Sequence, residues 1–533
     1  MKISILIFLT VISLSFSQNE VDSAYMASFG SVTINGKLYN QISVRPEIST
    51  NKIGMGFDIY LYFDEDGNLY RENWDFTSPR ASFKTIVDKI YYFRYGQPFD
   101  DLYFRIGALP KITLGHGILI NNYANNIDYP QIRRSGIDLR YQMSGFKFQF
   151  IHSDLKEINK PGLIGFRGSV PMVENFNIGF SIASDFNQYN GLVDSDGDGY
   201  PDFVEPDYAD DPDYHHQNES FIEHLEGNPT CVDNPVVCDG IIENLEQEMT
   251  ADFADVMNNK DNITGLAIDL GLQINDRFLI YSEYAQLLGE TSDPRDILDT
   301  ELFDTNLGYG FIPIGVRANF GGVEFSMDYR KNSDNFIFSY WDKNYDHNRI
   351  MENNGVLVTK ESTLYKYGAQ KGLNLGLEAN VSKYFKFSLD YAKMKGNIWQ
   401  SGSCNNSDYD NPVDCENVAN LWDDPNDDNA EEVVGEWTDS AYSKEKNNSL
   451  YLKLQIDTSS IPQVQIAEVF YQQTNSRNPF RFKPNQNSLF GYNIGINLSN
   501  NMIVVLKGRK SYEFSGSDYK PVHSTQIETS VYF

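Results

Sequence analysis

The sequence of 533 residues predicts an all-β fold, a transmembrane antiparallel β-barrel. We expect about 16–20 strands, with about 18 as the best estimate, because bacterial membrane barrels have even strand numbers in this range. Three observations predict this fold class: apolar and polar residues alternate along many runs, the two faces of each run differ in polarity, and short turns alternate with long acidic connections. Such a sheet would have lipid on one side and water on the other.

Alternation is clearest in residues 53–63, 102–108, 266–274, 323–330 and 490–498. Large apolar side chains occupy every second position, and Gly, Asn, Arg, Asp or Glu fill many positions between them. A period of two residues is that of a β-strand. Several runs approach the roughly 9–11 residues that cross a membrane, whereas strands of soluble sandwiches are usually nearer about 5–6. A soluble secreted β-protein stays the alternative, and it would be extracted without detergent.

Three segments are ambiguous. Residues 75–97 fit a strand or a short helix, residues 112–126 fit a bent strand or a segment folded into the lumen, and residues 332–370 contain loop and at least one hairpin. The clear runs are joined by short turns, such as 144–145 and 275–276. Between other runs the connections are long and acidic. Short turns on one side and long loops on the other are typical of membrane barrels.

The last residues, 521–533, alternate in the same way and end on an aromatic residue, Phe533. Ile527, Thr529 and Val531 form one face, and Gln526 and Glu528 belong to the other. This segment resembles the closing strand of bacterial outer-membrane β-barrels, whose final aromatic residue is read by the barrel-insertion machinery. The resemblance implies an outer-membrane location, contact with membrane lipid and that machinery, and pairing of this strand with one inside residues 24–48, since an open edge cannot lie in hydrocarbon.

The first 17 residues read as a cleaved secretory signal: a basic start, an apolar run at 3–14 and a small-x-small site. A membrane anchor is the alternative, but the run is shorter than the roughly 20 residues that span a bilayer. We expect residues 18–533 to form a single barrel with large insertions at about 188–261 and 396–447. Export favours disulfides within the two close cysteine pairs, Cys231 with Cys238 and Cys404 with Cys415.

The first insertion holds about twenty acidic residues against a single Lys260. Near its start, alternate carboxylates flank Gly199 with the spacing of a calcium loop, and it resembles thrombospondin type 3 and EF-hand-like loops. The predicted ligands of a structural calcium ion are Asp194, Asp196, Asp198, Tyr200 (through its carbonyl), Asp202 and Glu205. A solvated acidic loop is the alternative, because such dipeptides also form ordinary turns.

Alternation also predicts which charged residues face the lumen. The early strands contribute Arg94, Arg105, Arg140, Lys147 and Arg167. The middle strands contribute Asp269, Glu283, Glu324, Asp328, Glu378 and Asp390, with Arg317 and Lys386 among them. Opposed basic and acidic walls would set a transverse field across a pore. Alternatively, the charges pair between strands and fill a narrow lumen.

A porin-like channel for small solutes is the leading functional hypothesis. The alternative is a surface-exposed binding or structural barrel whose acidic, calcium-bound loops mediate adhesion or partner binding. No catalytic motif is present, so we do not expect an enzyme. The net charge of −31 argues against binding nucleic acid. The sequence does not indicate the solute or the oligomeric state.

Overall fold

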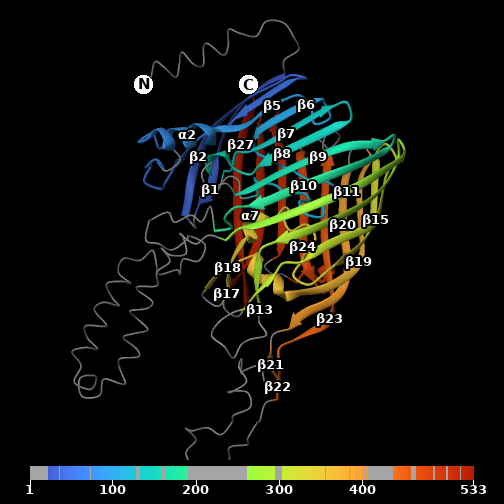
Figure 1. Ribbon diagram of the computed structural model, residues 1–533. Helices are drawn as coiled ribbons and strands as arrows, with labels where there is room; N and C mark the ends of the chain where they lie inside the picture. The colour runs from blue at the N-terminus through green and yellow to red at the C-terminus, as the bar shows by residue number, and fades with distance from the viewer. Residues whose placement is uncertain are drawn as a thin grey trace, which may run out of the picture.

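The computed structural model describes residues 22–34, 37–71, 74–127, 133–157, 162–189, 261–293, 303–353, 356–382, 385–400, 402–405, 436–457, 464–483, 487–499, 502–515 and 518–532. Most of these residues form a closed β-barrel, seen from the side in Figure 1. Neighbouring strands are antiparallel throughout, and the last strand pairs with the first. The predicted all-β barrel is therefore confirmed.

Within the described residues the wall has 20 strand positions. In chain order they are β1 (Asp22–Ile34), β2 (Lys37–Ser49), β3 (Ile53–Phe57) with β4 (Ile59–Phe63), β5 (Ile90–Tyr95), β6 (Leu102–Gly107), β7 (Gly136–Met143), β8 (Phe146–His152), β9 (Leu163–Val173), β10 (Phe176–Asp185), β11 (Ile263–Asn275), β12 (Phe278–Leu288), β15 (Tyr309–Asn319), β16 (Val323–Asn332), β19 (Tyr367–Ser382), β20 (Phe385–Gln400), β23 (Ala441–Asp457), β24 (Val464–Ser476), β25 (Ser488–Ser499), β26 (Met502–Ser515) and β27 (Asp518–Tyr532).

The remaining elements lie in the connections. Helical segments are α2 (Pro79–Asp88), α7 (Tyr345–Asn348), η2 (Leu155–Glu157), η3 (Glu361–Lys366) and η5 (Pro479–Arg481). Short hairpins are β13 (Glu290–Asp293) with β14 (Phe303–Asn306), β17 (Ile350–Asn353) with β18 (Val356–Thr359), and β21 (Ser403–Cys404) with β22 (Trp437–Thr438). No helix among the described residues is long and apolar enough to cross a membrane.

The best estimate of about 18 strands was too low. Residues 22–49, where Ser, Thr and Gly interrupt the apolar face, form the two strands β1 and β2. β3 and β4 are two halves of one wall strand, because both pair with β2 and Asp58 lies between them. The second insertion, expected at about 396–447, is shorter in the structure, because β20 extends to Gln400 and β23 begins at Ala441.

The barrel closes through the predicted pairing of its final strand with a strand near the start of the chain. β27 pairs with β1 from Met26 opposite Tyr532 to Val32 opposite Gln526, so its partner lies within residues 24–48 as expected. Ile527 is 49% exposed on the outer face, whereas Gln526 and Glu528 are buried inside. Phe533 lies outside the described residues.

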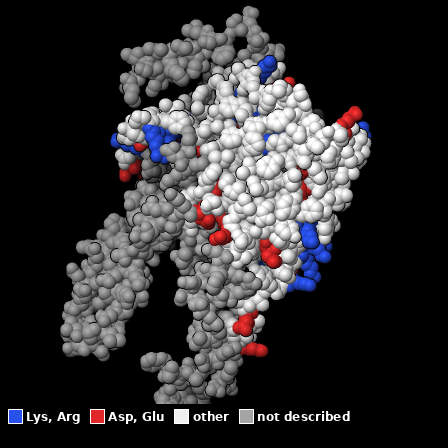
Figure 2. Space-filling model, viewed as in Figure 1, with Lys and Arg blue, Asp and Glu red and all other residues white. Residues whose placement is uncertain are grey.

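The outer face of the wall is apolar. Large side chains on many strands point outward and are exposed to the surroundings, among them Phe29, Ile42, Phe180, Ile268, Leu270, Leu373 and Ile496. In Figure 2 the visible wall carries few charged residues, and these gather toward its rims. A closed antiparallel barrel leaves no unpaired strand edge and can therefore stand in lipid. This architecture places the protein in the bacterial outer membrane.

The two rims differ. Nearly all links at one rim are short, such as residues 144–145, 276–277 and 320–322, and both described chain ends lie there (Figure 1). We call it the short-turn rim. At the opposite, long-loop rim, most connections are long, including residues 186–262 and 401–440. The ambiguous residues 75–97 form α2, which lies on this side, and the wall strand β5; Ser78 caps the helix and Pro79 starts it.

Candidate functional site

Two connections fold from the long-loop rim back into the barrel. We call residues 108–126, after β6, and residues 333–349, after β16, the inner segments. Their backbones pair with each other: the N–H of Asn121 donates to the carbonyl of Trp341 at 3.1 Å, and the N–H of Trp341 donates to the carbonyl of Leu119 at 3.1 Å. Of the two alternatives for residues 112–126, the structure therefore shows a segment folded into the lumen.

An apolar core holds the inner segments inside the barrel. From these segments, Ile118, Ile120, Tyr340 and Trp341 are completely buried. They pack against small or apolar inward side chains of β10, β11 and β12, namely Ala183, Ala267, Ala285 and Leu287. Gly265 on β11 makes room for this packing, because a Cβ there would lie 2.9 Å from Leu119 and 3.0 Å from Trp341.

Glu283 on β12 fixes the turn of the first inner segment. Its carboxylate accepts hydrogen bonds from the backbone N–H groups of His116 and Ile118, both at 3.1 Å. The imidazole of His116 stacks on Tyr281, with ring centroids 4.0 Å apart. Burial, together with the nearby Arg317 and Arg167, lowers the pKa of His116 to about 3, so this side chain is neutral. Glu283, which the sequence predicts to face the lumen, thus holds the backbone of the first inner segment in place.

Beside the inner segments, a passage follows the inner faces of β16, β19, β20, β23 and β24. It consists of two cavities, of about 390 and 90 Å³, whose linings share Asn122, Lys343 and Tyr451. The wider cavity opens at the short-turn rim, next to Gly321, and the lining of the narrower one extends to Asn475, where β24 ends. We call it the lumenal passage. Its narrow part has room for only a handful of water molecules.

Apolar side chains such as Phe336, Ile337 and Met394 line the narrow part together with a larger set of amide and hydroxyl side chains. The amide and hydroxyl side chains are Asn121, Asn122, Asn332, Gln370, Asn447, Gln472 and Asn475, with Ser339, Ser449 and Thr474. The wide part carries four lysines, Lys111, Lys343, Lys386 and Lys453, and two carboxylates, Glu324 and Glu378. The polar side chains of both parts offer hydrogen-bond partners to a solute in the passage.

Ion pairs account for several of these charges. Lys111 of the first inner segment pairs with Glu378 on β19, and Lys453 on β23 pairs with Glu468 on β24 at 2.8 Å. Glu324 lies 3.4 Å from Arg317. Within the described part of the chain, Lys343 and Lys386 have no carboxylate within ion-pair distance. The Lys343 ammonium instead lies 3.9 Å from the ring centroid of Phe470.

The basic residues predicted to line the lumen occupy different environments. Arg94 donates to the carbonyl of Thr50 at 3.2 Å, and Arg105 donates to the carbonyl of Ala108 at 2.7 Å. Arg140 pairs with Asp138 at 2.7 Å, and Lys147 is exposed beside the turn at residues 144–145. Arg167 lies 2.9 Å from Asp269 across β10, which ties a predicted base to a predicted acid.

The predicted acidic residues are divided in the same way. Asp269 and Glu283 lie against the first inner segment, and Asp328 pairs with Arg330 at 2.6 Å on the same strand. Glu324, Glu378 and Asp390 line the lumenal passage. Ion pairs within strands, between strands and with the first inner segment thus account for much of this charge. These contacts do not form a basic wall facing an acidic wall with both sets of charges unpaired.

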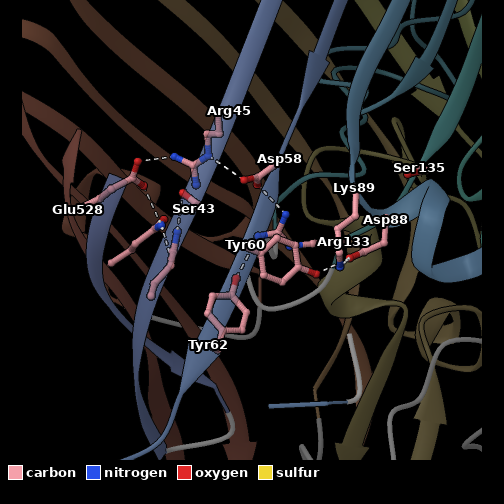
Figure 3. Close-up of polar contacts among 12 residues, drawn as sticks. Ser43, Arg45, Asp58, Tyr60, Tyr62, Asp88, Lys89, Arg133, Ser135 and Glu528 are labelled. Atoms are coloured by element: carbon pink, nitrogen blue, oxygen red, sulfur yellow. Dashed lines mark hydrogen bonds and ion pairs between the residues drawn. The ribbon is translucent and has the colours of Figure 1, made fainter. Parts of the chain in front are cut away.

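A second buried polar cluster joins the two ends of the chain (Figure 3). We call it the seam cluster. Arg45 on β2 pairs with Asp58 at 2.8 Å and with Glu528 on β27, on the far side of β1. Arg133 pairs with the other oxygen of Asp58 at 2.6 Å and donates to the Tyr62 hydroxyl at 3.0 Å. The cluster links the closing strand to β2 and to the interruption at Asp58.

Several predicted sites cannot be placed. The calcium loop, including Asp194, Asp196, Asp198, Tyr200, Asp202 and Glu205, lies outside the described residues, as do Cys231, Cys238 and Cys415. Cys404 is described, in β21. Among the described residues, no group of acidic, His or Cys side chains could hold a metal ion. The calcium ion and the cysteine pairs therefore stay predictions.

Sequence reasoning missed the residues that define the passage on its inner side. Lys343 and Asn122 belong to connections, where no period of two residues indicates the direction of a side chain. Arg133 was missed for the same reason. Asp58 could have been found, because it is the only charged residue within the alternating run 53–63. The Gly and Ala residues on the inner faces of β10–β12 were a second signal, since small residues there leave space for an inner segment.

No protein-family model and no curated protein matches this sequence. Among solved structures, it is similar to OccK11 from Pseudomonas aeruginosa, with a TM-score of 0.30, 6% identity, and coverage of 96% of this chain and 95% of that one. It is also similar to the FrpB iron transporter from Neisseria meningitidis, with a TM-score of 0.34, 10% identity, and coverage of 97% and 82%. Similarities at these scores and identities carry no argument about function.

Proposed function

We propose that this outer-membrane barrel is a channel for passive passage of small hydrophilic solutes, which cross through the lumenal passage. The observation that carries the proposal is the pair of adjacent cavities of about 390 and 90 Å³, which share three lining residues and carry polar side chains from Gly321 at the short-turn rim to Asn475 near the long-loop rim. A buried lining of Asn, Gln and Ser that served only packing would be costly unless fully hydrogen-bonded. Among the described residues, Asn447 bonds to Gln370 at 2.9 Å and Gln472 to Asp342 at 2.8 Å, and water in the passage can accept a hydrogen bond from the Nε2 of Gln370, which has no protein partner.

The same geometry limits what can cross. The inner segments occupy the lumen beside β10–β12 with an apolar core, so solutes are confined to the side along β16–β24. The narrow part admits a small solute with little of its hydration shell. We therefore expect a small conductance, below that of an unobstructed barrel with as many strands.

Planar-bilayer recording of the purified barrel tests the proposal. Ser388 on β20 lines the wide part, and the variant Ser388→Trp should reduce the conductance by filling it. Leu389 is the next residue and points to the opposite face, so Leu389→Trp is a matched control that should leave the conductance unchanged. A wild-type barrel without any conductance would overturn the channel.

The second candidate function is a membrane anchor for surface loops. The observation that favours it is the apolar packing of Trp341, Tyr340 and Ile118 inside the lumen, which resembles a stable core more than a movable gate. An anchor predicts a non-conducting barrel and binding that depends on residues 188–261 and 401–440. Loop-deletion variants assayed for surface binding separate it from the channel.

A further inference from the structure

The charges along the lumenal passage do not cancel. Six cationic side chains and four carboxylates line its two cavities. The cations are Lys111, Lys343, Lys386, Lys453, Arg330 and Lys360, and the carboxylates are Glu324, Glu378, Asp342 and Asp390. Ion pairs occupy Lys111, Lys453, Arg330 and Lys360. Among the described residues, Lys343 and Lys386 lack a carboxylate within ion-pair distance, and of the four carboxylates only Asp390 lacks a cation within that distance, so the unpaired charges of the lining are two ammonium groups against one carboxylate.

Lys343 is held in position although no ion pair fixes it. The preceding residue, Asp342, accepts a hydrogen bond from Gln472 at 2.8 Å and lies 3.8 Å from Lys360. The Lys343 ammonium lies 3.9 Å from the ring centroid of Phe470 and 5.5 Å from that of Tyr451. Aromatic faces attract the cation without neutralising its charge. The ammonium thus stays available where the wide and narrow cavities meet.

Lys386 on β20 lines the same wide cavity from the barrel wall. Its register partner on β23 is Gln455, and Ser388 follows it on the inner face. The same cavity is lined by Asn122 of the first inner segment and by Asn380 near the end of β19. Two ammonium groups surrounded by amide and hydroxyl donors suit an oxyanion, because each oxygen can accept from a charged and a neutral donor.

We propose that Lys343 and Lys386 form an oxyanion site, so that the lumenal passage prefers small solutes bearing a carboxylate or phosphate group. This inference rests on the proposed channel and names its solute class. Neighbouring pairs such as Lys111 with Glu378 contribute little net field, so selectivity depends on these two lysines. Each ammonium group lies a few ångströms from a permeating anion in a water-filled passage. It should therefore change the ratio of anion to cation permeability by about fivefold.

The reversal potential in a potassium chloride gradient measures this preference. Wild-type barrel should favour chloride over potassium, Lys343→Gln and Lys386→Gln should each reduce the permeability ratio by about fivefold, and the double variant should reduce it further. Lys395 lies on the same strand with its side chain exposed on the outer face, so Lys395→Gln is the matched control. Cation preference in the wild type, or equal ratios in all variants, would overturn the oxyanion site.

Binding of inorganic phosphate provides a readout that does not need conductance. Calorimetric titration of the detergent-solubilised barrel should give a binding signal that is lost in the double variant and kept in Lys395→Gln. If the barrel conducts but shows neither phosphate binding nor anion preference, the channel function stands and the oxyanion site is wrong. If phosphate binding depends on both lysines but the barrel does not conduct, the oxyanion site stands and the channel function is wrong.

Discussion

Replacing Arg45 by Met tests whether the seam cluster stabilises barrel closure. The Arg45 side chain is only 14% exposed, and its carboxylate partners Asp58 and Glu528 are 1% and 3% exposed. Removing one member of a buried ion pair leaves an uncompensated charge and costs about 3–5 kcal/mol. Met keeps most of the side-chain volume, so the loss comes mainly from charge. We therefore expect Arg45→Met to lower the free energy of unfolding by about 3–5 kcal/mol.

Urea titration of the barrel in detergent micelles, followed by tryptophan fluorescence, measures this change. The matched control is Arg477→Met, because Arg477 also pairs with a carboxylate, Glu445 at 2.7 Å, but is 66% exposed. An exposed pair contributes about 0–1 kcal/mol, so the control should stay close to the wild type.

A second substitution separates charge from packing. Adding Glu528→Gln to Arg45→Met removes one of the two buried carboxylates left without Arg45, and should recover part of the lost stability. If Arg45→Met and Arg477→Met unfold at the same urea concentration, the seam cluster does not stabilise closure. If the double variant is less stable than Arg45→Met, packing and not buried charge explains the loss.

Three further predictions concern the lumen and the loops. Trp341→Ala should increase single-channel conductance and current noise, because loss of a buried Trp costs about 3–5 kcal/mol of packing in the inner segments; an unchanged recording contradicts their role as the constriction. Burial, with Lys453 nearby, lowers the pKa of Lys343 to about 8, although Glu468 opposes this shift and Lys111 adds to it. Anion preference should therefore fall as the pH rises from about 7 to 9, and Lys343→Gln should abolish this dependence. Chelating calcium should expose residues 188–261 to protease, as should Asp198→Asn; equal cleavage with and without calcium counts against the calcium loop.

The wall was predictable because each of its strands carries its own evidence. In β11, for example, Ile268 and Leu270 are exposed on the outer face while Asp269 is buried, as alternation requires. The closing pair β1–β27 followed from one physical condition, that no strand edge stays open in lipid. The strand count was less accurate, because β1 and β2 carry many small polar residues and β3 and β4 are separated at Asp58.

The candidate site was less predictable, since its inner side belongs to connections. A period of two residues assigns a direction to Lys386 and Ser388 on β20, but gives none for Lys343 or Asn122. Alternation also says which charges face inward without saying which of them pair. Glu378 lines the lumenal passage, and it pairs with Lys111, a residue of the first inner segment. Pairing needs the path of the connection, which tertiary packing decides.

The position of the apolar core inside the lumen depends on which side chains the wall strands point inward. A barrel of this size would leave a wide water-filled interior if every inward side chain were polar. On β10–β12 the inward positions include Ala183, Ala267 and Ala285, and Gly265 would clash with Trp341 if it had a side chain. Apolar connections can bury themselves only against such a surface, while β16–β24 keep amide, hydroxyl and charged side chains. The difference between the two halves of the wall therefore determines where the inner segments pack and where the passage remains.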